Sequence, residues 1–151
     1  ELADMGLGPN GGVVFHFVGT LTTTAKTTPF PGQPSFDCAG LYGQTCGSPL
    51  PSWRHVFGVT WQTPWDITLT TTWRFIGSST LDSNSTQPSL TNGIDHVNGK
   101  IGDYSYLDLS AAWQADEHVE LRAGVTNVFD LDPPILDDAI TGSGTPNTFN
   151  S

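Results

Sequence analysis

The stretch WRHVFGVTWQTPWDITLTTTWRFIG, residues 53–77, decides the fold of this chain. It is typical of two β-strands joined by the turn signal TPWD. Because side chains on a strand point to opposite faces in turn, each strand has one apolar and one polar face. The apolar positions are Trp53, His55, Phe57, Val59 and Trp61 in the first strand and Ile67, Leu69, Thr71, Trp73 and Phe75 in the second.

Tryptophans gather near the ends of these strands. A soluble sandwich buries its aromatic residues mid-strand, whereas a membrane barrel turns its apolar face outward and ends it with aromatic girdles at the two interfaces. The pattern favours a barrel, although tryptophans can also stack on sugars. The expected girdle residues are Trp53, Trp61, Trp65, Trp73 and Trp113.

The composition agrees with an all-β chain. The 151 residues suit one domain, and only 13% are charged, against roughly 25% in ordinary soluble domains. Gly 17, Pro 11 and many threonines favour strands and turns. No apolar run approaches the roughly 18 residues of a membrane helix, and no signal pattern is seen at the start. A net charge of −10 argues against a nucleic-acid partner.

Two cysteines, Cys38 and Cys46, lie in a loop rich in Gly and Pro. Their spacing suits a small disulfide that closes the loop in an oxidising compartment. A zinc site would need two more ligands nearby, and none is close in the sequence. We therefore expect the disulfide.

The remaining pattern extends this to an antiparallel meander of about five strands. The expected strands cover residues 12–26, 53–62, 67–77, 104–114 and 119–129. Their connections alternate between long and short, and tryptophans flank both short turns. Short turns at one end and long loops at the other are typical of outer-membrane barrels, whose tilted strands need roughly 9–11 residues.

Three segments resemble the TonB-dependent receptors, the outer-membrane active transporters of Gram-negative bacteria. FDCAGLYGQTCGSPLPSWRH (36–55) is similar to a cysteine-bracketed loop of one subgroup. YLDLSAAWQADEHVELRAGVTNVFD (106–130) resembles the penultimate hairpin, with its Gly-Val-x-Asn-Val-Phe-Asp strand end. The tail PNTFNS (146–151) looks like the last outer loop before the closing strand.

The resemblance implies a barrel of about 22 strands with a plugged lumen. Residues 1–151 would be its C-terminal segment, without the plug and without the final strand. It implies uptake of a scarce small-molecule substrate (an iron chelate, cobalamin or a saccharide) energised through TonB. The implied partners are outer-membrane lipid, the rest of the barrel and plug, and TonB through the missing N-terminal part.

Polar residues on the strands are candidates for the lumen, where they would meet a plug or substrate. They are His16, Arg54, Arg74, Asp108, Glu120 and Arg122. Pairing across neighbouring strands, as for Arg74 with Asp108 or Glu120 with the neighbours of Arg122, is the alternative interpretation. Neither a catalytic motif nor a convergent set of histidines (His55, His96, His118) is present, so we expect neither an enzyme nor a cofactor or metal. The acidic residues Asp130, Asp132, Asp137 and Asp138 are interpreted as a solvated loop surface.

Two further functions stay open at this level. A secreted adhesin or lectin-like module would bury its apolar face and fold alone in water. A detached fragment with exposed strand edges would assemble edge to edge into fibres.

Overall fold

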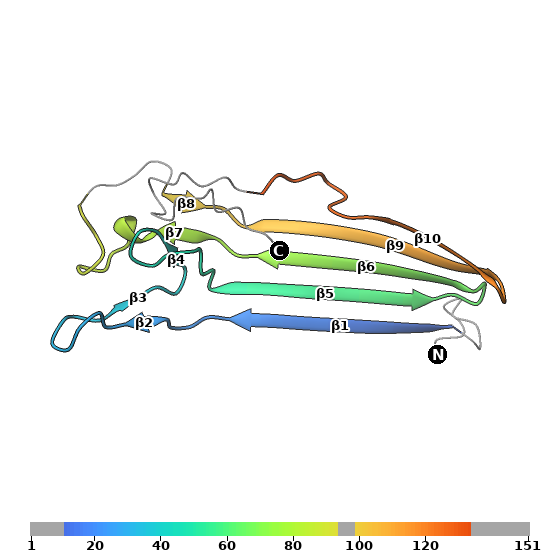
Figure 1. Ribbon diagram of the computed structural model, residues 1–151, viewed down its shortest axis with the longest axis horizontal. Coiled ribbons are helices and arrows are strands. Elements are labelled where there is room, and N and C mark those ends of the chain that lie inside the picture. The colour runs from blue at the N-terminus through green and yellow to red at the C-terminus, as the bar shows by residue number, and fades with distance from the viewer. Residues whose placement is uncertain (1–10, 94–98, 134–151) are drawn as a thin grey trace. The chain divides into compact units, whose positions relative to one another are not determined.

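The computed structural model describes residues 11–93 and 99–133, and its main feature is one five-stranded antiparallel sheet (Figure 1). The strand order is β1-β5-β6-β9-β10, so each strand pairs with the strand of this sheet that comes next along the chain. The strands are β1 (Gly12–Leu21), β5 (Trp53–Gln62), β6 (Ile67–Ile76), β9 (Tyr104–Asp116) and β10 (Val119–Val125). The predicted five-strand meander is therefore confirmed.

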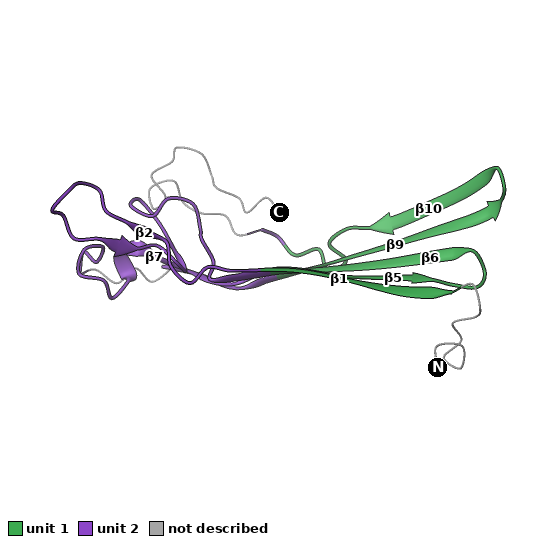
Figure 2. Cartoon of the chain, turned by 90° about the horizontal axis from the view of Figure 1, so that it is seen from below, with its two compact units in different colours: residues 1–19, 55–75, 105–131 green, residues 20–54, 76–104, 132–151 purple. Residues whose placement is uncertain are grey.

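The described residues fall into two compact units, coloured in Figure 2. Of these residues, unit 1 contains 11–19, 55–75 and 105–131, and unit 2 contains 20–54, 76–93, 99–104 and 132–133. Unit 1 therefore holds most of the large sheet and both tight turns. Unit 2 holds the first connection (residues 22–52) and the second connection (residues 77–103).

The tight turn between β5 and β6 is fixed by Thr63. Its backbone N–H donates to the carbonyl of Ile67 at 2.8 Å, and its buried hydroxyl accepts the N–H of Ile67 at 3.2 Å. Asp66 takes the positive φ of 58° that such a turn needs. This is the turn that the signal TPWD predicts.

Unit 2 contains short strands inside both connections. The first connection holds β2 (Lys26–Thr27), β3 (Phe36–Asp37) and β4 (Leu41–Tyr42). The second holds β7 (Ser79–Leu81), the 3-10 helix η2 (Asp82–Asn84) and β8 (Lys100–Ile101). Strands β2 and β3 form a hairpin, while β4, β7 and β8 form a three-stranded sheet that includes both connections. These strands are absent from the sequence prediction, which treats both segments as loops.

The expected strand limits need three corrections. β1 ends at Leu21 rather than Lys26, because the chain leaves the large sheet and Lys26 pairs with Asp37 instead. β9 continues to Asp116, so its turn is shorter than expected. β10 ends at Val125 rather than Phe129, because Asn127 adopts a φ of 52°, which a strand cannot continue.

Several predictions fall outside the described residues. They concern His96, Asp137, Asp138 and the tail 146–151. Within residues 11–93 and 99–133, the structure contains no helix with the length and hydropathy needed to span a membrane.

Candidate functional site

One face of the large sheet carries an aromatic cluster. His55 lies at its centre, 4.6 Å from the Trp73 ring in an edge-to-face arrangement and 5.3 Å from the Phe75 ring, which it stacks upon. Phe17 of β1 lies 5.7 Å from His55. These residues belong to three adjacent strands and to the face that the alternation assigns as apolar. The prediction that they share one face of the sheet is therefore confirmed.

This apolar face is exposed. Phe15 is 69% exposed, Leu121 54% and Trp113 47%. The β9–β10 register places Trp113 opposite Leu121, and Leu109 opposite Val125, on the same face. A folded chain in water buries such a surface, whereas a membrane strand presents it to lipid.

The expected girdle tryptophans occupy different places along the strands. Trp61 lies near the end of β5, Trp65 lies within the turn at residues 63–66, and Trp53 begins β5. Trp73 lies inside β6, where its indole Nε1 donates to Ser105 Oγ at 2.6 Å. The structure therefore places Trp53 and the pair at the turn at opposite ends of β5.

The opposite, polar face contains a network around Asp108. The Asp108 carboxylate lies 3.2 Å from Arg74 Nε, and its Oδ1 accepts from Arg74 Nη2 at 3.3 Å. The same Oδ1 accepts the backbone N–H of Asn127 at 2.8 Å. The Arg74 guanidinium also lies 5.5 Å from the centre of the buried Tyr106 ring. Pairing of Arg74 with Asp108, one of the two interpretations of these residues, is thus observed.

Asn127 itself closes the end of β10. Its side-chain Oδ1 accepts the N–H of Leu131 at 3.1 Å, and its Nδ2 donates to the Leu131 carbonyl at 3.0 Å. The Val128 N–H donates to the Leu107 carbonyl at 2.8 Å. The Gly-Val-x-Asn-Val-Phe-Asp segment therefore forms a strand end and a turn that Asp108 anchors from the neighbouring strand.

A second ion pair lies on the edge strand β10. Arg122 Nε and Nη2 donate to the two oxygens of Glu120, at 2.8 Å and 3.0 Å. The pair runs along one strand rather than across to the next one, which corrects the expected cross-strand pairing of Glu120. It borders a hollow of about 360 Å³, lined by Thr68, Thr70, Ser110, Ala111, Ala112, Glu120, Arg122 and Ala123.

Two other polar-face candidates are less constrained. His16 of β1 lies beside Gly58, where a Cβ atom on the glycine would be 3.7 Å from the His16 Cβ. Arg54 is exposed at the start of β5 and makes no ion pair with any residue that the structure describes. The structure therefore joins Arg74 to Asp108 and Glu120 to Arg122, but does not bring all six candidates together.

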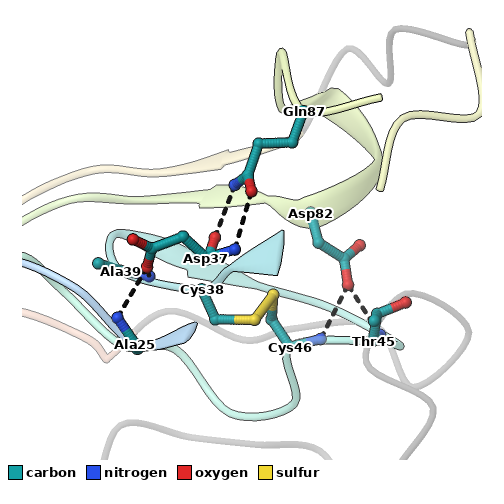
Figure 3. The surroundings of a disulfide bond; sticks show 8 residues. All are labelled: Ala25, Asp37, Cys38, Ala39, Thr45, Cys46, Asp82 and Gln87. Carbon is teal, nitrogen blue, oxygen red and sulfur yellow. Dashed lines mark hydrogen bonds between the residues drawn. A yellow bond between two sulfur atoms is a disulfide. The ribbon is translucent and has the colours of Figure 1, made fainter. Parts of the chain in front are cut away.

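The disulfide between Cys38 and Cys46 is formed, with the Cα atoms 5.5 Å apart (Figure 3). Next to it, the Asp37 carboxylate accepts the N–H groups of Ala25 at 2.7 Å and Ala39 at 3.0 Å. These two hydrogen bonds lower the pKa of Asp37 below its usual value. The carboxylate thus joins the root of the β2–β3 hairpin to the disulfide.

A buried carboxylate, Asp82, lies on the other side of the disulfide. Its Oδ2 accepts the N–H groups of Thr45 at 2.8 Å and Cys46 at 3.0 Å. Burial, together with the negative charge of Asp82, raises the pKa of the neighbouring Tyr42. The sequence analysis missed Asp82. The apolar residues Leu41, Tyr42, Leu81 and Ile101, which are buried, could have indicated a small core in these loops, but they do not indicate Asp82 itself.

The described part of the chain holds no group of three or more His, Cys, Asp or Glu side chains arranged for a metal ion. Its polar clusters are ion pairs and backbone caps. These contacts stabilise strands and loops, and the hollow beside Glu120 and Arg122 has a mixed lining of polar residues and alanines.

Long antiparallel strands with an exposed apolar face, a polar opposite face, tight turns and long ordered loops define the class of outer-membrane β-barrel proteins. The family described as TonB dependent receptor-like, beta-barrel, matches residues 4–128, and the chain belongs to this family. Comparisons with curated proteins and with solved structures gave no significant match. These receptors are transporters rather than enzymes, and they reside in the outer membrane of Gram-negative bacteria.

Proposed function

We propose that the chain forms part of the wall of a TonB-energised transporter for a scarce small molecule: an iron chelate, cobalamin or a saccharide. The observation that supports this most directly is the separation of faces: one is apolar and exposed, whereas the other carries the Arg74–Asp108 network and the Glu120–Arg122 pair. A transport lumen needs a polar wall, and the surrounding lipid needs an apolar one.

In this proposal the polar face lines the lumen. His16, Arg54, Arg74, Asp108, Glu120 and Arg122 would then face the substrate path or a plug. Trp53 and Trp73 would belong to one aromatic girdle, and Trp61, Trp65 and Trp113 to the other. The strand lengths support this, because β1, β5 and β6 each contain 10 residues, enough to cross a bilayer core when tilted.

The open edges of the sheet support a larger barrel. β1 and β10 each pair with only one other described strand. Unpaired backbone groups are not tolerated in lipid, so further strands must continue the sheet on both sides. We propose that the chain is the C-terminal segment of a barrel of roughly 22 strands, whose plug and TonB-contacting segment lie outside residues 1–151.

The transport proposal is tested by deleting the gene in its host and measuring uptake of radiolabelled iron chelates, cobalamin and oligosaccharides. We expect one ligand class to lose high-affinity uptake, and a strain lacking TonB to show the same loss. Normal uptake of all three classes in the deletion strain would contradict the proposed substrates. Equal loss in the deletion strain but normal uptake without TonB would contradict the energy source.

The facing proposal is tested separately with single cysteines at two adjacent residues, Thr70 on the polar face and Leu69 on the apolar face. In the intact protein in lipid vesicles, a water-soluble maleimide should label T70C faster than L69C, and a bilayer-confined reagent should show the reverse. Labelling at equal rates by both reagents would contradict the facing. The native cysteines are joined in the disulfide and do not react.

Family membership and the exposed apolar face favour the transporter over a secreted adhesin, which would bury that face. The edge-to-edge fibre concerns a detached fragment only, and it stays a prediction based on the free edges of β1 and β10.

A further inference from the structure

The first and second connections are built into each other. β4 of the first connection pairs in parallel with β7 of the second, with Leu41 opposite Thr80 and Tyr42 opposite Leu81. The side chains of Tyr42, Leu81 and Ile101 form a buried cluster, with Tyr104 packed against it. Two segments that the sequence separates therefore share one small core in unit 2.

Polar contacts join the same two segments near the disulfide (Figure 3). Gln87 of the second connection accepts the N–H of Asp37 at 2.8 Å and donates to the Asp37 carbonyl at 2.6 Å, as a strand partner would. Asp82 accepts the N–H groups of Thr45 and Cys46 through one oxygen. The second connection therefore hydrogen-bonds to the residue next to Cys38 and to Cys46 itself.

Among these contacts, those of the Asp82 carboxylate should be the most sensitive to substitution. Asp82 is 5% exposed, and its hydrogen bonds to Thr45 and Cys46 are partly buried, so removal of its carboxylate would leave both N–H groups without this acceptor. The site is also shaped from the other side, because a Cβ atom on Gly43 would overlap the carboxylate. Gly43 has a φ of 140°, which further favours glycine.

We propose that Asp82 is a positioning residue that couples the two long connections, so that they keep and lose their order as a single unit. The physical reason is that Cys46 cannot move away from the second connection while its N–H is bound to Asp82, and the disulfide transmits that restraint to Cys38 and β3. This coupling of the connections is separate from transport and does not depend on which ligand is carried.

The test uses hydrogen exchange with mass spectrometry on the intact protein in lipid vesicles. Asp82→Leu should raise the exchange rate about tenfold or more in peptides from both connections, residues 41–47 and 79–81. Asp82→Asn retains a carbonyl oxygen for both N–H groups, so its exchange should lie closer to the wild type than to D82L. Asp103→Leu is the matched control, because Asp103 is exposed in the same connection, and it should change neither peptide.

A second pair of variants probes the contact from the first connection. Gly43→Ala should reproduce the D82L effect in both peptides, although it lies on the opposite segment. Gly102→Ala, where no atom lies within 4 Å of the added Cβ, should have no effect. Heat-modified mobility on gels checks that each barrel is inserted.

Faster exchange in both connections with D82L and G43A, partial retention with D82N and none of the effect with the controls would support the proposal. Faster exchange confined to the mutated connection would overturn it, as would a D82N variant as fast as D82L. If D82L fails to insert, G43A decides between the same two results.

Discussion

Removal of the Asp108 carboxylate should loosen the polar face at the point where three strands meet. Asp108→Ala deletes the ion pair with Arg74 and the acceptor for the Asn127 N–H. Hydrogen bonds to charged groups contribute about 1.5–3 kcal/mol each when partly buried. Arg74 and Asp108 side chains are 26% and 23% exposed, so solvent reduces the ionic part, and we expect a loss of about 3 kcal/mol in the free energy of unfolding.

The two contributions are separated by a double-mutant cycle. Arg74→Met alone should cost about 1–2 kcal/mol, because Asp108 keeps its bond to Asn127. Combined with Asp108→Asn, which also retains one oxygen for that N–H, the pair should show a coupling of about 1 kcal/mol. The assay is urea unfolding of the intact protein in lipid vesicles, followed by tryptophan fluorescence.

A coupling below about 0.3 kcal/mol, the usual error of additivity, would refute the reasoning that the ion pair stabilises the sheet. Glu120→Gln is the matched control, because the Glu120–Arg122 pair is exposed on β10, and its loss should leave the free energy of unfolding unchanged within error.

Three further predictions concern Asp37, the disulfide and the close contact between Gly77 and Trp53. Because hydrogen bonds lower the pKa of Asp37, its stabilisation of the β2–β3 root should be fully present above the usual value of 3.8 and be lost as the pH falls through the lowered pKa. Hydrogen exchange of the Ala25 and Ala39 amides between pH 5 and pH 2 should follow that order, and Asp37→Asn should remove the pH dependence. Replacing both Cys38 and Cys46 by Ser should destabilise the first connection by about 2.5 kcal/mol, seen as faster proteolysis of residues 28–50 at unchanged barrel stability. Gly77→Ala should destabilise the sheet by about 1–3 kcal/mol in urea, because its Cβ would lie 2.8 Å from the Trp53 carbonyl oxygen, and stability equal to that of Gly102→Ala would contradict this.

The large sheet could be predicted from sequence because its side chains alternate with a period of two. Trp53–Gln62 and Ile67–Ile76 match their predicted limits within one residue, since a turn signal and a change of pattern coincide there. The end of β10 differs from the prediction, because Phe129 keeps the phase of Val125 although Asn127 has already turned the backbone.

The short strands of unit 2 could not be predicted in the same way. Its strands are two or three residues long, too short for a period to be seen, and β4 pairs with a segment from the other connection. The disulfide follows from cysteine spacing, and its pairing is confirmed. Asp82 has no local signature, because its two donors lie 37 and 36 residues away, and only the fold brings them together.

The order of strands has a consequence for how the chain reaches its native state. In a meander every strand pairs with its neighbours in sequence, so the β5–β6 and β9–β10 hairpins can form from local segments without waiting for distant ones. The first connection is roughly eight times longer than the turn at residues 63–66, yet closing it costs only about 2 kcal/mol more in chain entropy. The two hairpins should therefore form first during refolding. β1 should pair with β5 last, once the first connection between them has ordered.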